Sequence, residues 1–296
     1  MITKASMIYG MGDSLNGRAF LVTYCKQKNI PTSSITIYTE KYWWMFEGLG
    51  FKRTLVKPMG LYPYKNFGRY DLPRFFRPNE LDQCIAMNAQ INYSFEVCVP
   101  FPEYKLPDIK LPKKFITFNT GYGDLTGNPK EKNKVCIKAW PIKYWEEFVR
   151  KIGVPCVQVG AGPSCVSIPG VALDLVNKLT IQESIEVMRR GLFHVDMEGG
   201  LAILNQHLGK KSVVLFGPTA IENQGRSFNL NLRSNVCTPC YEWGKQIHTT
   251  LYEDPKKLGC SIECMASLTP DFVIQKIKDS GWLNQVNYIE GFKDEL

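Results

Sequence analysis

The feature that most constrains the fold of this chain is the alternation of short apolar runs with longer amphipathic runs between residues 115 and 216. Short apolar runs bounded by glycine or polar residues predict strands, and runs with helical periodicity predict helices. Strands that alternate with helices form right-handed crossover units, so we expect an α/β domain with a doubly wound parallel sheet. The expected strands are 115–119, 156–159, 192–196 and 212–216, and the expected helices are 142–151, 181–190 and 200–208.

The first part of the chain begins with the same alternation. A strand at 6–9 leads through a glycine turn into a helix at 15–28, and a strand at 35–38 and a second helix at 42–51 follow. The pattern weakens after residue 57, and the prolines that cluster before residue 112 are typical of a linker between domains. We therefore expect two Rossmann-like domains, residues 1–112 and 113–296, with a ligand cleft between them. The last helix, 269–280, is a candidate to pack back on the first domain.

The composition is that of a folded globular protein, because 44% of the residues are hydrophobic and 22% are charged. The formal charge of +8 favours acidic partners such as sugar nucleotides, phosphorylated glycans, anionic membrane surfaces or nucleic acids. No apolar run approaches the about 18 residues of a membrane helix, and the first residues lack the pattern of a secretory signal. We expect a cytoplasmic protein without an integral membrane segment, with peripheral attachment to the inner membrane left open.

A carboxylate follows the first glycine turn, in the sequence Gly10-Met11-Gly12-Asp13. Glycines let the backbone approach a ligand closely, and a carboxylate at that place could accept the proton of an attacking hydroxyl as general base. The alternative is that Asp13 only caps the helix that follows. The motif alone does not separate the two interpretations.

Two motifs in the second domain are suited to a nucleotide diphosphate. Lys138 comes just before an expected helix start, where unpaired N–H groups and a cation favour phosphate; the alternative is a solvated lysine beside a packed tryptophan. Glu198 could accept hydrogen bonds from two ribose hydroxyls, while Gly199 and Gly200 let a pyrophosphate reach the helix start. The alternative for that motif is a helix cap with a tight turn.

A third motif, Gly217-Pro218-Thr219, follows a buried strand and could close over the donor phosphates. By itself it is a strand and a turn. The order and spacing of all these motifs resemble the donor-binding half of the heptosyltransferase family. The matching segments are Lys138-Ala139-Trp140-Pro141, Val-Gln-Val-Gly at 157–160, Leu-Thr-x-x-Glu at 179–183, Glu-Gly-Gly at 198–200 and Phe-Gly-Pro-Thr at 216–219, with Gly12-Asp13 similar to the family's Gly-Asp pair.

The resemblance implies a GT-B glycosyltransferase that moves a sugar with inversion, from a nucleotide-diphosphate sugar to a hydroxyl of a glycan, a lipid-linked glycan or another acceptor. It implies that Asp13 is the general base and that Lys138 binds the diphosphate. It also implies a donor site that includes Gly12, Glu198, Gly199, Gly200, Gly217, Pro218 and Thr219, and transfer without a metal cofactor. The chain departs from the family at Ile203, where many members have histidine, which puts a heptose donor in doubt.

Four of the ten cysteines form two pairs, Cys237 with Cys240 and Cys260 with Cys264. Two such pairs about 20 residues apart can surround one tetrahedral metal ion. Zinc is the default from geometry, and some members of the resembled family carry a similar cluster that binds iron. The alternative is a set of reduced, packed thiols.

Two other functions stay open from the sequence. The basic surface would also suit a glycosyltransferase that modifies DNA bases or protein side chains. A function of another class is a non-catalytic sugar-nucleotide or metal-binding module whose cysteines contact a partner.

Overall fold

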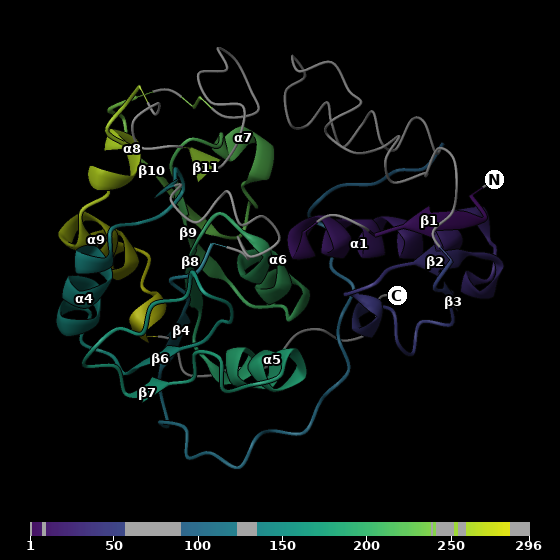
Figure 1. Ribbon diagram of the computed structural model, residues 1–296, viewed down its shortest axis with the longest axis horizontal. Coiled ribbons are helices and arrows are strands. Elements are labelled where there is room, and N and C mark those ends of the chain that lie inside the picture. The colour runs from purple at the N-terminus through teal and green to yellow at the C-terminus, as the bar shows by residue number, and fades with distance from the viewer. Residues whose placement is uncertain are drawn as a thin grey trace. The chain divides into compact units, whose positions relative to one another are not determined.

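The computed structural model describes residues 2–7, 10–56, 90–122, 135–237, 239–240, 252–253 and 259–284. Its contacts divide the chain into two compact units, Met1–Phe101 and Pro102–Leu296, referred to below as unit 1 and unit 2. Each unit contains its own parallel sheet (Figure 1).

Unit 1 has a three-stranded parallel sheet in the order β1-β2-β3. Its strands are short and pair in register, with Lys4 opposite Thr36 and Thr36 opposite Lys52. The long helix α1 connects the first two strands, as the sequence predicted for a crossover unit. The elements are β1 (Lys4–Ser6), α1 (Met11–Lys28), η1 (Thr32–Ser34), β2 (Thr36–Tyr38), η2 (Trp43–Met45) and β3 (Lys52–Thr54).

Two sequence predictions for unit 1 need correction. Helix α1 begins at Met11, so the glycine turn is already its first turn, with Gly10 as N-cap. The helix predicted at 42–51 is reduced to the single turn η2. Gly48 and Gly50 both have positive φ, 78° and 79°, which ends helical structure and turns the chain into β3.

Unit 2 has a six-stranded sheet, all parallel, in the order β10-β9-β8-β4-β6-β7. Counted along the chain this is the strand order of a doubly wound Rossmann sheet, with the change of direction between β4 and β8. A separate antiparallel ribbon pairs β5 with β11. The strands are β4 (Ile116–Phe118), β5 (Val135–Cys136), β6 (Cys156–Gln158), β7 (Leu173–Asp174), β8 (His194–Met197), β9 (Ser212–Phe216), β10 (Leu230–Arg233) and β11 (Tyr252–Glu253).

Helices cover both faces of this sheet, with α4 and α9 on one face and α5 and α6 on the other (Figure 1). The boundaries of α4 and α5 are those predicted, because each has a clear local start signal. Pro141 is the N-cap of α4, and Thr180 forms a capping box with Glu183 at the start of α5. The helical elements are α4 (Ile142–Lys151), α5 (Ile181–Arg190), α6 (Gly200–His207), α7 (Ile221–Gln224), α8 (Glu263–Ala266), α9 (Pro270–Asp279) and η4 (Trp282–Asn284).

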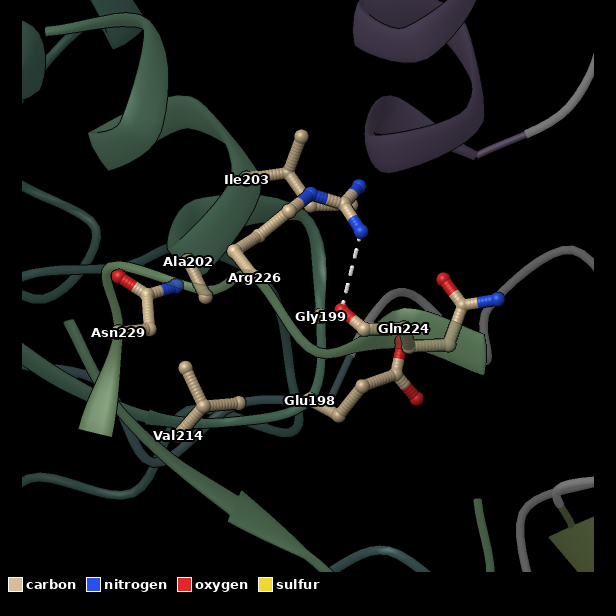
Figure 2. A pocket seen from close by; sticks show the side chains of 8 residues that line it. All are labelled: Glu198, Gly199, Ala202, Ile203, Val214, Gln224, Arg226 and Asn229. Atoms are coloured by element: carbon tan, nitrogen blue, oxygen red, sulfur yellow. Dashed lines mark hydrogen bonds between the residues drawn. The ribbon is translucent and has the colours of Figure 1, made fainter. Parts of the chain in front are cut away.

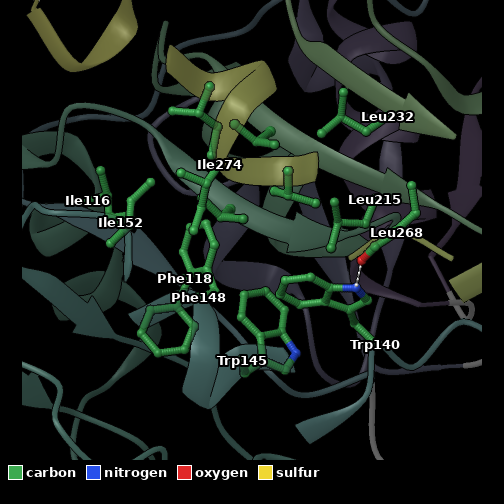
Figure 3. Close-up of a cluster of buried hydrophobic side chains, with 14 of the residues drawn as sticks. Ile116, Phe118, Trp140, Trp145, Phe148, Ile152, Leu215, Leu232, Leu268 and Ile274 are labelled. Carbon is green, nitrogen blue, oxygen red and sulfur yellow. Dashed lines mark hydrogen bonds between the residues drawn. The ribbon is translucent and has the colours of Figure 1, made fainter. Parts of the chain in front are cut away.

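The main core of unit 2 lies between the sheet and the α4–α9 face (Figure 3). Trp140, Trp145 and Phe148 pack there as edge-to-face aromatic pairs, and Phe118 of β4 stacks on Trp145. The Trp140 indole N–H donates to the Leu268 carbonyl at 2.7 Å. This bond connects the aromatic cluster to the residues just before α9.

The last helix does not pack as we expected. Val273, Ile274 and Ile277 of α9 are buried in the core of unit 2, so the apolar face of this helix is used within its own unit. The residues after 284 lie outside the described part of the chain.

The segment expected to be a linker contacts unit 2 closely. The Tyr104 N–H donates to the Glu186 carboxylate of α5 at 2.9 Å, and Arg189 donates to the Pro102 carbonyl at 3.0 Å. The division between the units comes after Phe101, near the start of the proline-rich segment 100–112, whereas the sequence placed it near residue 112.

Trp140→Phe should lower the free energy of unfolding by about 2 to 4 kcal/mol, because it leaves the buried Leu268 carbonyl without its donor and removes part of a buried ring. Urea unfolding measures the change. The matched control is Ile142→Ala two residues away, where 36% of the residue is exposed and the expected change is about 0.5 kcal/mol or less. Equal stability of the two variants would contradict a structural role for the indole.

Candidate functional site

The Lys138 ammonium and the Glu198 carboxylate, 60 positions apart in sequence, form an ion pair in unit 2. Their side chains are only 11% and 10% exposed. Lys138 lies just after β5, and Glu198 follows β8, where its N–H donates to the Leu215 carbonyl of β9 at 3.1 Å. The structure thus brings together two of the residues that the sequence selected for donor binding.

The surroundings of this ion pair are largely desolvated. Burial raises the pKa of the neighbouring Cys136 thiol to about 11, with the Lys138 charge acting against this shift and the Glu198 charge adding to it. A nearly buried ion pair is costly to break, because the remaining charge then lacks both water and a partner. Any ligand that separates the two groups has to supply new partners for both.

Helix α6 starts at Gly200, two residues after Glu198. Gly199 is its N-cap in fully extended conformation, with no side-chain hydrogen bond to the first turn. The N–H groups at such a helix start are not used within the helix and favour anionic groups. Gly199 and Gly200 therefore present backbone donors beside the Lys138–Glu198 pair.

The Gly-Pro-Thr loop follows β9 and is packed against the cysteine region. A side chain at Gly217 would place its Cβ 2.4 Å from Met265 Sδ, so any larger residue here would displace the buried Met265 side chain. The Pro218 carbonyl accepts from the Cys240 N–H at 2.9 Å. The Thr219 hydroxyl is buried and has no hydrogen-bond partner within the described ranges.

A narrow pocket opens beside Glu198 and extends between α6, α7 and β9 (Figure 2). Its volume is about 10 Å³, room for about one water molecule. It therefore forms a notch at the side of the site, too small for a whole nucleotide. Its lining residues are Glu198, Gly199, Ala202, Ile203, Val214, Gln224, Arg226 and Asn229.

Two polar residues of this pocket were missed from the sequence. Gln224 is 5% exposed, and neither amide atom finds a hydrogen-bond partner among the residues that the structure describes. Arg226 donates to the Gln206 side chain at 2.9 Å. It also donates to the Gln224 carbonyl at 3.1 Å (Figure 2). The sequence signal that could have identified both residues is their position just after the Gly-Pro-Thr loop. A buried amide without partners is costly, so Gln224 is suited to contact a bound ligand.

Asp13 and Gly12 lie in unit 1, in the first turn of α1. Gly10, not Asp13, is the N-cap, so the capping alternative does not hold in the form expected from the sequence. The Asp13 side chain is partly exposed, and its negative charge raises the pKa of the Tyr42 phenol, second to the effect of burial. The Asp13 carboxylate therefore lies near Tyr42, in the first turn of a helix.

A buried polar network occupies the point where the strand order of unit 2 reverses. Asn119 follows β4 and donates to the Asp196 carboxylate of β8 at 3.2 Å. The His194 ring is fully buried between the Thr117 hydroxyl at 2.9 Å and Asp196 at 3.4 Å. Burial raises the pKa of Asp196, against the opposing effect of these hydrogen-bond partners. His194 is thus a core residue with a polar partner on each side of its ring.

The four clustered cysteines approach one another. The charge of Cys237 and its hydrogen bond with the Cys264 thiol add to burial, which is the largest cause of the increase in the Cys264 pKa to about 12. Burial, followed by the charges of Cys237 and Cys260, raises the pKa of Cys240 to about 11. Within the described ranges, however, no three metal-binding side chains form a group close enough to hold an ion.

Comparison with known proteins identifies the fold of the chain. No family model and no curated protein sequence matches the chain. Among solved structures it is similar to the iron-containing dodecameric glycosyltransferase TibC from enterotoxigenic E. coli H10407, with 14% identity, a TM-score of 0.64 and 95% and 76% of the two chains covered. The chain has the fold of the heptosyltransferases. This confirms the GT-B class expected from the sequence.

Two further structures support the same assignment of the fold. A glycosyl transferase of family 9 from Veillonella parvula DSM 2008 shares 13% identity at a TM-score of 0.62, with 95% and 96% of the chains covered. The E. coli ADP-heptose LPS heptosyltransferase II shares 12% identity at a TM-score of 0.55, with 96% and 99% of the chains covered.

In the described part of the chain, no helix is both long and apolar enough to cross a membrane.

Proposed function

We propose that the chain is a glycosyltransferase that transfers a sugar from a nucleotide-diphosphate donor to a hydroxyl acceptor with inversion, in the assembly of a glycan or lipopolysaccharide. The observation that carries this proposal is the Lys138–Glu198 pair at the start of α6, on a heptosyltransferase-like fold. The fold alone suggests a glycosyltransferase, and the proposed donor chemistry is argued from the residues of the site. The proposed reaction takes place in the cytoplasm.

In this proposal the donor breaks the Lys138–Glu198 pair and provides a new partner for each group. The diphosphate takes the Lys138 ammonium and the N–H groups of Gly199 and Gly200, and the ribose hydroxyls donate to Glu198. The Gly217-Pro218-Thr219 loop covers the phosphates. The Thr219 hydroxyl and the Gln224 amide, both buried without partners in the described structure, would gain theirs from the donor.

The proposed chemical step is a direct displacement at the anomeric carbon. Asp13 removes the proton of the acceptor hydroxyl as its oxygen forms the new bond to that carbon. The bond to the diphosphate breaks, and the electron pair leaves with the diphosphate. Lys138 and the helix start stabilise the charge that develops there. No residue other than Asp13 is required to change its protonation state.

We also propose that Cys237, Cys240, Cys260 and Cys264 hold one structural metal ion, iron or zinc. Thiols are suitable ligands for either ion, and binding would require these four interacting cysteines to come closer together than in the described structure. A bound ion would stabilise the loop that it crosslinks, and through the Cys240–Pro218 hydrogen bond it would also support the Gly-Pro-Thr loop. The transfer chemistry itself involves only the donor, the acceptor and the residues named above.

A thermal-shift titration with nucleotide-diphosphate sugars and free nucleoside diphosphates tests the donor site. A ligand at 100 times its dissociation constant stabilises a protein by about 2.7 kcal/mol, which is easily measured as a higher melting temperature. We expect one nucleotide to give this shift in the wild-type protein and a much smaller one in Lys138→Met. No shift with any nucleotide diphosphate would contradict the proposed function.

Protein purified without added metal should contain about one iron or zinc ion per chain, and Cys240→Ser should contain much less, because it removes one of four ligands. Elemental analysis measures the ion, and Cys98→Ser in unit 1 is the matched control that should keep it. Negligible metal in the wild-type protein would leave the four cysteines as packed thiols.

A further inference from the structure

A second pocket lies at the opposite edge of the unit 2 sheet. Phe115 comes just before β4, Arg190 lies at the end of α5 before β8, and Lys210 comes just before β9. All three positions are at the amino ends of the strands, whereas Glu198 and Gly217 follow the carboxyl ends. The pocket has a volume of about 230 Å³ and is lined by Leu111, Pro112, Lys113, Phe115, Arg189, Arg190 and Lys210.

The lining is strongly basic. Two guanidinium groups, Arg189 at 3.2 Å and Arg190 at 2.6 Å, share the single buried carboxylate of Glu186. One carboxylate cannot neutralise two cations, and Lys113 and Lys210 add two more positive charges to the same pocket. Among these five side chains the formal excess is three positive charges, which creates a potential that attracts anions.

Lys210 is the decisive group. Its ammonium has no carboxylate and no hydrogen-bond partner within the part of the chain that the structure describes, although the side chain is largely desolvated, and this burial lowers its pKa. The turn at Gly209, with a φ of 68°, and the Lys210 N–H bond to the Asn205 carbonyl hold it in place. A desolvated ammonium without a partner is unfavourable, and a bound anion would restore both charge and hydrogen bonds.

The volume and the lining residues of the pocket restrict the class of ligand that it can bind. Its volume is many times the about 10 to 15 Å³ that one water molecule needs, and more than a single small inorganic ion fills. Leu111, Pro112 and Phe115 supply an apolar wall beside the cations. That combination suits a phosphate group with part of an organic substituent attached.

From this geometry we infer that the pocket formed by Lys113, Arg189, Arg190 and Lys210 is a second anion site, which binds the phosphate of a phosphate ester, carried by a soluble metabolite or by a lipid headgroup. This site is separate from the donor site and does not depend on the proposed transfer reaction. A lipid headgroup would place this edge of unit 2 at an anionic membrane surface; a soluble ester would act as a small-molecule ligand.

Two probes distinguish the sources of the phosphate. Calorimetric titration with glycerol phosphate tests a soluble ester, and sedimentation with phosphatidylglycerol vesicles, compared with phosphatidylcholine vesicles, tests a headgroup. Both use the Lys138→Met variant as well as the wild-type protein, so that phosphate bound at the donor site is not counted. If only glycerol phosphate binds, the ligand is a soluble phosphate ester. If only the phosphatidylglycerol vesicles bind, the ligand is a lipid headgroup.

Lys210→Met should weaken binding of the effective probe by about 10-fold or more, the usual effect of losing a charge-assisted hydrogen bond. Lys210→Arg should keep most of the binding, since it keeps the charge. Lys178→Met is the matched control, because it removes an exposed cation near β7 outside this pocket. Lys113→Met, at an exposed position of the same pocket, provides an independent test if Lys210→Met does not fold.

Either of two results would overturn the inference. One is that neither glycerol phosphate nor the anionic vesicles bind to the Lys138→Met variant. The other is that binding is the same in Lys210→Met, or in Lys113→Met where that variant is used, as in Lys178→Met.

Discussion

Asp13→Asn should lower the rate of sugar transfer by a factor of about 10² to 10⁴ while donor affinity stays unchanged, because asparagine cannot accept the proton of the acceptor hydroxyl. The structure makes this test cleaner than the sequence did. Gly10 is the N-cap of α1, so the substitution removes no capping residue. The substitution also removes the attraction between the negative charge and the helix start, which should lower the free energy of unfolding by about 0.3 to 1 kcal/mol.

The measurement is the turnover rate and the donor affinity of both proteins, with the donor identified by thermal shift. Glu47→Gln is a matched control, since it makes the same chemical change at an exposed position of unit 1. It should leave turnover unchanged. If Asp13→Asn keeps near-normal turnover, Asp13 only stabilises the start of α1, and the base is another group.

Glu198→Ala should have two effects. It removes one partner of a nearly buried ion pair, so we expect the free energy of unfolding to fall by about 3 kcal/mol. It also removes the proposed acceptor of the ribose hydroxyls, so donor affinity should fall by about 10-fold or more. The ion pair is the reason that the substitution should also affect stability.

A second substitution separates these two effects. Lys138→Met combined with Glu198→Leu replaces the ion pair by apolar side chains, which often restores stability, so the double variant should be more stable than Glu198→Ala. Donor binding should remain lost, because both polar contacts are missing. Urea unfolding and donor calorimetry measure the two quantities. The control is Glu222→Ala, whose carboxylate is 60% exposed and pairs with Arg233 at the surface, for which we expect about 0.5 kcal/mol or less.

Full donor affinity in a folded Glu198→Ala protein would contradict the role of Glu198 in nucleotide binding. Unchanged stability would contradict the view that the Lys138–Glu198 pair is desolvated. Because the two outcomes are independent, a failure of one leaves the other prediction intact.

The sequence by itself determined the elements whose signals are local. Helix α5 begins at a capping box formed by Thr180 and Glu183, and α4 follows Pro141, so both could be placed to the residue. Strand β9 is a continuous apolar run that is buried on both faces. Local signals of this kind also placed Lys138, Glu198 and the Gly-Pro-Thr loop next to strand ends and helix starts.

Only the tertiary structure decided which distant residues meet. The ion pair of Lys138 with Glu198, the Cys240 contact with Pro218 and the pocket of four cations around Lys210 each depend on how separate segments come together at one sheet. No short-range pattern encodes these contacts, because they join segments far apart in the chain. The same reason explains why α9 was misplaced: an apolar helix face indicates that a partner surface exists, but only the packed core reveals which surface it is.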